Sequence, residues 1–216
     1  MGQHERYGKL GVAAVLLMAG CSKAEKDGDG SRPPSDESPA PSIAVAPPAA
    51  EPPRAESPRQ LLMSKTTLAE AVATVRSEMT DTDDSTSPGA VLLALWAVKH
   101  LKWADVAVAK NETSPALVRK DSDASRGKRM CVRGRLIQIQ KENVDGGAVF
   151  SGLLLSGYTE ITSFIVAGST GELVAQSRAR LCGVVIGTYD YSNSAGGKGH
   201  AISLVGMFDL PENRTR

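Results

Sequence analysis

Aromatic side chains are scarce in this chain of 216 residues, where Trp, Tyr and Phe together make up 4% of the sequence. So few rings argue against a surface on which bases or sugars stack. An excess of one charge is also missing, since the formal net charge is +1. No overall field therefore favours a nucleic acid or an anionic surface. These two absences disfavour nucleic acid as a partner.

Catalytic and cofactor-binding motifs are missing as well. No Gly-x-Ser-x-Gly motif surrounds a serine. Neither a Walker lysine nor a Rossmann fingerprint follows the segment Gly168–Gly171, which we interpret as a turn. The two histidines beyond residue 20, His100 and His200, lack the paired spacing of zinc ligands. We therefore predict no metal, no cofactor and no catalytic residue.

Apolar side chains large enough to build a core are almost absent from residues 22–59, where Ile43 and Val45 stand alone. Nine of the twelve prolines fall in this segment, among Ser, Ala, Asp and Glu. Such a composition cannot bury enough surface to offset its ordering entropy. We predict a lipidated cysteine and Pro-rich tether over residues 21–59, spanning roughly 100 Å when fully extended.

The chain begins with an apolar run, Leu10–Met18, that is shorter than the roughly 20 residues a helix needs to cross a bilayer. Basic residues precede the run, and small residues follow it at Ala19 and Gly20. This layout is typical of a secretory signal peptide, which we predict over residues 1–20. An uncleaved anchor and a chance apolar terminus are the alternatives.

The end of the run, Met18-Ala19-Gly20-Cys21, resembles the lipobox of bacterial lipoproteins. The resemblance implies cleavage after Gly20, acylation of Cys21 and attachment to a membrane through the lipid. In many Gram-negative lipoproteins an aspartate after the cysteine retains the protein at the inner membrane. Ser22 stands there in this chain, which favours an outer-membrane location facing the periplasm.

Two helical patterns occupy the predicted helical segment, residues 60–110. The first combines a capping threonine at Thr66 or Thr67 with apolar residues at helical spacing up to Met79. The second has Ser87 as N-cap and Pro88 at the first helical position, and extends through Leu101. A polar run from 80 to 87 separates the two predicted helices.

Beyond residue 111 the pattern changes to strands. Gly134 predicts a bend or bulge, the segment 143–147 a hairpin turn, and Glu172–Ser177 one or two helical turns. Five strands are predicted: Met130–Gln140, Ala148–Leu155, Ile161–Ala167, Ala179–Tyr189 and His200–Phe208.

This order of elements resembles the OB-fold, a five-stranded Greek-key barrel. The predicted fold class is therefore α+β, with two N-terminal helices followed by a five-stranded OB-like β-barrel domain over 111–216. Another small barrel or sandwich with helices outside it is the alternative.

Three cysteines occur, and lipid on Cys21 would leave Cys131 and Cys182. An even pair in an exported protein favours a disulfide, with two buried thiols as the alternative. The resemblance to the OB-fold supports the disulfide, because it makes the first and fourth strands neighbours.

A glycine-rich stretch between the last two strands gathers polar and aromatic side chains, and loops on a rigid scaffold often bind ligands. A flexible hairpin that only covers the barrel edge is the structural alternative. The candidate ligand-binding residues are Tyr189, Asp190, Tyr191, Asn193, Lys198 and His200.

A basic run enters the first strand and could meet phosphates or an acidic partner, although we interpret it as a solvated rim. It comprises Lys120, Arg126, Lys128, Arg129, Arg133 and Arg135.

The leading hypothesis is a lipid-anchored, non-enzymatic cell-envelope protein that binds a partner or ligand. One alternative is an envelope hydrolase that uses His200, Asp190 and Tyr191. The other is an OB-fold that binds an oligosaccharide or nucleic acid on its second and third strands, where Phe150, Tyr158 and Phe164 are the only aromatic residues.

Overall fold

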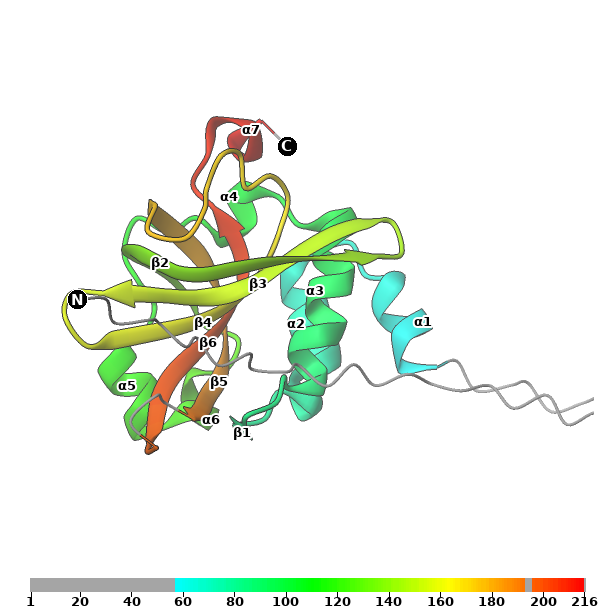
Figure 1. Cartoon of the computed structure of the whole chain (residues 1–216). Coiled ribbons are helices and arrows are strands. Elements are labelled where there is room, and N and C mark those ends of the chain that lie inside the picture. Colours follow the sequence, from blue (N-terminus) through cyan, green and yellow to red (C-terminus); the bar gives the residue numbers. More distant parts are fainter. Residues whose placement is uncertain (1–56, 193–195, 216) are drawn as a thin grey trace, which may run out of the picture. The chain divides into compact units, whose positions relative to one another are not determined.

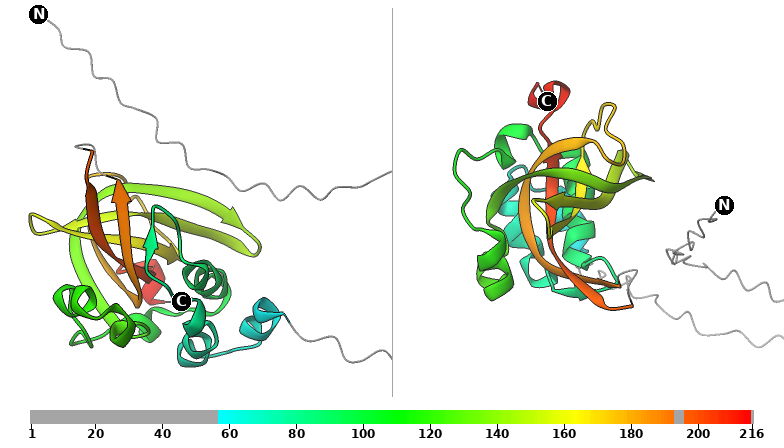
Figure 2. Two further views of the ribbon diagram at one scale, coloured as in Figure 1. Left: turned by 90° about the horizontal axis from the view of Figure 1, so that it is seen from below. Right: turned by 60° about the vertical axis from the view of Figure 1, so that its left-hand side comes forward.

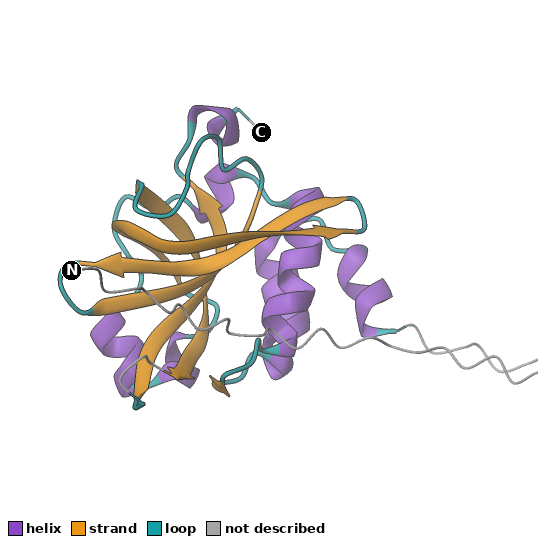
Figure 3. Ribbon diagram, viewed as in Figure 1, coloured by secondary structure: helices purple, strands orange, loops and turns teal. Residues whose placement is uncertain are grey.

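Short helices occupy the first half of the described chain, which comprises residues 57–192 and 196–215 of a computed structural model (Figures 1 and 3). Helix α3 packs across one side of the sheet, and α2 packs against α3. The helical elements are α1 (Pro58–Met63), α2 (Leu68–Val75), a 3-10 turn (Arg76–Glu78), α3 (Pro88–His100), α4 (Trp103–Val106), α5 (Pro115–Lys120), α6 (Ser122–Ser125) and α7 (Pro211–Arg214).

Local sequence explains where the two main helices begin. Thr67 caps α2 through a capping box with Glu70, in which each side chain bonds the other residue's backbone N–H. Pro88 opens α3, as predicted, and Ser87 is its N-cap residue. The Ser87 hydroxyl does not cap the helix, however. It donates to the Glu78 carbonyl at 2.9 Å and accepts from the Thr80 N–H, which fastens the start of α3 to the end of the preceding turn.

Five strands close into a ring in the order β2-β3-β4-β6-β5, since β5 pairs with both β2 and β6. The pairing of β4 with β6 is parallel and the other four are antiparallel. This ring resembles the OB-fold, and Figure 2 shows the strands curving round with the helices outside. The strands are β2 (Arg129–Val144), β3 (Gly147–Ser156), β4 (Glu160–Ala167), β5 (Arg178–Ser192) and β6 (Lys198–Phe208).

The five strands were predicted correctly from the sequence, but the connection between β4 and β5 was not. The predicted helical turns at Glu172–Ser177 are absent, and this connection contains turns instead. Gly171 and Gln176 adopt positive φ angles of 50° and 74°, which a right-handed helix excludes. Leu173 nevertheless packs against the interior of the barrel, so the connection covers that end without a helix.

Gly134 marks the point where β2 changes partner. The strand pairs with β5 up to Arg135 and with β3 from Arg135 onward. A Cβ on Gly134 would lie 2.2 Å from the Leu155 carbonyl oxygen, so only glycine permits this close approach. The bulge that the sequence suggested here lies slightly later, between Leu136 and Gln138.

Apolar side chains line both surfaces of the barrel wall. One cluster fills the interior and includes Leu136, Leu154 and Phe164. The other joins the outer surface of the strands to the helices, with Trp96 of α3 and Met207 of β6 both fully buried in it. The helical layer therefore shares a core with the barrel.

The observed boundaries differ in detail from the predicted ones. Helix α1 begins at Pro58, inside the segment predicted as tether, and its start is capped by Ser57. More helices precede the barrel than the two predicted, because α1 comes before them and the short helices α4, α5 and α6 follow. A two-residue strand, β1 (Thr82–Asp83), also lies between the two predicted helices, within the run read as a polar linker.

Candidate functional site

The end of the β5–β6 hairpin brings five of the six candidate residues together; Asn193 lies outside the described residues. Asp190 stands directly opposite His200 in the strand register. The imidazole Nδ1 lies 2.7 Å from Asp190 Oδ1, and the His200 side chain is 63% exposed. These two side chains form a solvent-exposed acid–imidazole pair at the rim of the barrel.

The two candidate tyrosines form a stacked pair. Their ring centroids are 6.2 Å apart with an interplanar angle of 16°. A Cβ on Gly199 would lie 2.3 Å from the Tyr191 ring, so this glycine makes room for the ring to cover β6. Burial, together with the charges of Asp84 and Asp83, raises the pKa of the Tyr189 hydroxyl. The ring of Tyr189 therefore lies beside acidic side chains.

Those acidic side chains belong to the segment around β1, which adds to the edge of β5 as a parallel strand. The Thr188 N–H donates to Asp81 Oδ1 at 2.7 Å. The Ser192 N–H and hydroxyl donate to Asp84 at 2.9 and 3.0 Å. We call Asp81–Asp84 the acidic clasp, because its carboxylates hold the far end of β5.

The acidic clasp also binds the side chain of Lys198. The ammonium group forms an ion pair with Asp83, and this hydrogen bond raises the pKa of the lysine. The sequence did not indicate this contact, because residues 80–87 were predicted only as a polar run between two helices. Three aspartates in four residues were the available signal, but nothing in the sequence indicated which strand they bind.

The hydrolase hypothesis requires a nucleophile within reach of His200. Across residues 57–192 and 196–215, no hydroxyl or thiol is hydrogen-bonded to His200, and Tyr191 stacks on Tyr189. No cluster of three or more potential metal-binding side chains occurs within this described part of the chain. The pair can accept or donate a proton, and the described residues place no attacking atom beside it.

The outer face of the second and third barrel strands, where OB-folds bind oligonucleotides and oligosaccharides, is largely covered in this protein. Helix α3 packs across β3, β4 and β6, burying Val149 and Ala167. Phe164 is 1% exposed and points into the barrel, whereas Tyr158 is 98% exposed in the β3–β4 turn. Phe150 is half-buried and packs against the same interior cluster. The three aromatic residues predicted for this face therefore form no stacking surface.

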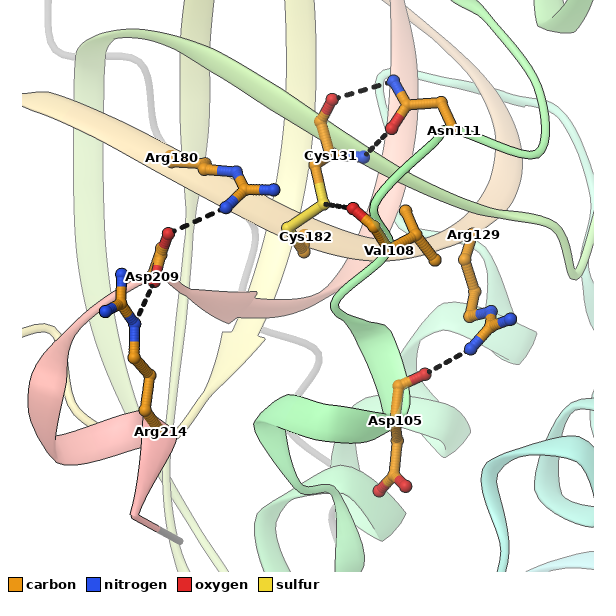
Figure 4. The surroundings of a disulfide bond; sticks show 9 residues. All are labelled: Asp105, Val108, Asn111, Arg129, Cys131, Arg180, Cys182, Asp209 and Arg214. Carbon is orange, nitrogen blue, oxygen red and sulfur yellow. Dashed lines mark hydrogen bonds and ion pairs between the residues drawn. A yellow bond between two sulfur atoms is a disulfide. The ribbon is translucent and has the colours of Figure 1, made fainter.

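The predicted disulfide joins Cys131 and Cys182, which are direct partners across β2 and β5 with Cα atoms 4.0 Å apart (Figure 4). The Asn111 side chain brackets Cys131, accepting from its backbone N–H at 2.8 Å and donating to its carbonyl at 3.0 Å. These two hydrogen bonds hold the loop before α5 against the barrel.

The predicted basic run separates into two groups. Arg126 pairs with Asp81 and Asp123, and Arg129 pairs with Glu112. Arg133 and Arg135 instead continue along β2 to a depression that they share with two arginines of β5. Arg133 and Arg135 are both exposed, as predicted for a solvated rim, whereas Arg126 and Arg129 are half-buried in their ion pairs.

The predicted signal peptide, Cys21 and most of the tether lie outside the described residues. Within the described part, no helix is long and apolar enough to span a membrane.

No family model and no curated protein sequence matches this chain. Among solved structures, a mitochondrial single-stranded DNA-binding protein from S. cerevisiae, Rim1, is 17% identical over 39% of this chain and 94% of its own, with a TM-score of 0.27. A Plasmodium falciparum SSB complex with ssDNA is 16% identical over 38% and 90%, with a TM-score of 0.24. Similarities this low add nothing to the strand pairing described above.

Proposed function

We propose that this chain is a lipid-anchored, non-enzymatic protein of the cell envelope whose barrel binds a partner or ligand. The observation that carries the proposal is the sequence Met18–Cys21, with its apolar run before it and the Pro-rich segment after it. Lipid on Cys21 would hold the barrel near a membrane, and the tether would give it reach.

The first test concerns the anchor. Expressed in a Gram-negative host, the Cys21→Ala variant should remain an unprocessed precursor, whereas the wild-type chain should be cleaved and fractionate with the membranes. Ser22→Ala is the matched control and should be processed normally. Normal cleavage and membrane retention of Cys21→Ala would refute the lipoprotein assignment. A Ser22→Asp variant should move from the outer to the inner membrane.

The rim of the β5–β6 hairpin is the surface that we propose for partner binding. It carries a stacked tyrosine pair on one face of the hairpin and the exposed pair of Asp190 and His200 on the other, all on two strands of a rigid barrel. Tyrosine is among the residues that most often carry binding energy at protein interfaces.

A photo-crosslinker in place of Tyr191 would test this surface in intact envelopes. It should give a discrete adduct, and the Tyr191→Ala and His200→Ala variants should lose capture of the same partner. Tyr158, a fully exposed tyrosine in the β3–β4 turn, supplies the control: a crosslinker there should give no such adduct. Equal adducts from both positions, or capture unchanged in the variants, would remove the rim from consideration.

The pair of Asp190 and His200 also keeps the hydrolase as a second candidate, because its 2.7 Å separation is that of a general base with its orienting carboxylate. An ester such as p-nitrophenyl acetate provides the test. Hydrolysis that His200→Ala abolishes and His100→Ala leaves intact would replace the non-enzymatic proposal.

A further inference from the structure

Four arginines stand in two directly opposed pairs where β2 meets β5. Arg133 is the register partner of Arg180, and Arg135 is the partner of Arg178. Residues two apart on a strand point to the same face, so all four side chains share one face of the barrel wall. We call these four residues the arginine site.

Acidic side chains neutralise little of this charge. Arg180 is 3.0 Å from Asp209, but that carboxylate also binds Arg214 at 2.7 Å (Figure 4). Within the described residues, the side chains of Arg133, Arg135 and Arg178 make no ion pair and no hydrogen bond. Like charges placed directly opposite each other destabilise a sheet. The arginine site therefore costs stability in the unliganded protein.

Other arginines of this chain show that the arrangement is not general. Three arginines elsewhere have carboxylate partners: Arg119 with Glu160, Arg126 with Asp81 and Arg129 with Glu112. The guanidinium of a fourth, Arg76, donates instead to the backbone carbonyls of Asp123 and Arg126. Only at the arginine site does the fold collect several guanidinium groups from two strands and leave most of them unpaired among the described residues. This contrast indicates a binding site for an anionic ligand.

The surface is hollowed at this position. A depression of about 640 Å³ is lined by the four arginines together with Leu155 and Gly157. Rows of side chains two residues apart on a strand are separated by about 7 Å. Each row carries two guanidinium groups, whose planar forks match the oxygens of one phosphate group. The site thus offers two adjacent phosphate positions.

We propose that the arginine site binds the diphosphate group of an anionic ligand, free or lipid-linked. The proposal goes beyond the function argued above, since it uses neither the rim of the β5–β6 hairpin nor the anchor at Cys21. It depends only on residues of β2 and β5 and on the turn after β3.

Calorimetric titration of the purified full chain with inorganic pyrophosphate at low salt tests the site. The wild-type protein should bind pyrophosphate more tightly than orthophosphate. An Arg133→Gln/Arg178→Gln variant, which removes one member of each pair, should bind pyrophosphate at least about tenfold more weakly. Arg119→Gln, an exposed arginine paired with Glu160, is the matched control and should bind like wild type.

Two further measurements separate binding from folding. The Arg133→Gln/Arg178→Gln variant should melt no lower than wild type, since it relieves repulsion between like charges. Arg178→Lys keeps the charge but loses the fork, and should weaken pyrophosphate binding while leaving the melting point unchanged. Pyrophosphate binding that is equal in wild type and in both variants would overturn the proposal.

A second titration, with farnesyl diphosphate, distinguishes a lipid-linked diphosphate from a free one. Tighter binding than to pyrophosphate assigns a lipid-linked diphosphate, and equal binding assigns the diphosphate group alone; each supports the site. A single-stranded oligonucleotide that binds through these arginines and that pyrophosphate fails to displace would overturn the proposal in favour of nucleic acid.

Discussion

At the scale of single residues, what matters most is which partner each charged or sulfur-bearing side chain meets. Cys131 and Cys182 meet because their strands pair in register, and their bond spans a sequence separation of 51. Asp209 meets two arginines at the end of β6. The disulfide and the pair of Asp209 with Arg180 join segments that are separate in the sequence, so both should contribute measurably to stability.

Removing the disulfide should destabilise the fold by about 2–4 kcal/mol, because the bond restricts a closed loop of this length in the unfolded chain. Urea unfolding of the Cys131→Ala/Cys182→Ala variant measures this loss. Reductant supplies the control: it should lower the unfolding midpoint of the wild-type chain and leave that of the variant unchanged. Two reactive thiols in the native exported protein would contradict the disulfide.

Asp209 should make stability depend on acidic pH. Its hydrogen bond from Arg214, with a further one from Arg180, holds the pKa of this carboxyl below its ordinary value of 3.8, although burial opposes the shift. A lowered native pKa contributes stability that is complete above the unfolded pKa and is lost as the pH falls below about 4.

Asp209→Asn should therefore be roughly 1–3 kcal/mol less stable than wild type at pH 7, and the difference should shrink below about pH 4. Unfolding curves measured across pH 2–7 test this. Asp145→Asn, at a carboxylate 76% exposed in a loose contact with Arg59, should show little difference at any pH. A constant difference for Asp209→Asn would mean that its charge is not the cause.

At the scale of elements, the start of α3 shows how tightly the helical layer is packed. A Cβ on Gly89 would lie 2.6 Å from backbone atoms of Glu78 and Met79. Glycine is a poor helix former, and it is required in the first turn of α3 because a side chain there would overlap the backbone of residues 78–79.

Gly89→Ala should accordingly destabilise the protein by about 1–3 kcal/mol through steric overlap, although alanine raises intrinsic helix propensity by about 1 kcal/mol. Chemical denaturation provides the measurement. Val91→Ala, at an exposed position in the same helix, should change stability by less than about 0.5 kcal/mol. If Gly89→Ala proved more stable than wild type, the close contact between α3 and residues 78–79 would be wrong.

At the scale of the whole molecule, the helices and the barrel share one apolar cluster. Leu93 and Trp96 of α3 lie in it with Val184 of β5 and Val205 of β6. A shared core of this kind should make the two layers unfold together.

The two tryptophans, Trp96 and Trp103, both lie in the helical layer, so their fluorescence reports the helices, whereas far-UV circular dichroism also reports the strands. The two signals should give coincident unfolding transitions. Leu93→Ala should shift both equally, by about 2–5 kcal/mol. A fluorescence transition that precedes the loss of β-structure would show that the helical layer unfolds separately.

Sequence alone determined the elements that depend on neighbouring residues. The cap at Thr67, the proline at the first position of α3, the turn after Val144 and the five apolar strand segments were all predicted, because each is a local choice of backbone conformation. Local signals gave a wrong prediction at residues 172–177, where helical turns were expected. Gln176 has a positive φ angle there, which its intrinsic helix propensity does not indicate.

Only the tertiary structure decided which distant residues meet. Asp81 binds the backbone of a strand 107 residues later in the chain. The arginine site combines Arg133 and Arg135, which the sequence indicated only as part of a solvated rim, with two arginines of β5 that no pattern singled out. Helix α3 covers the outer face of the barrel that the OB-like order of elements had left available for a ligand. These contacts depend on strand register and packing, and a shift of one residue would turn each arginine to the other face.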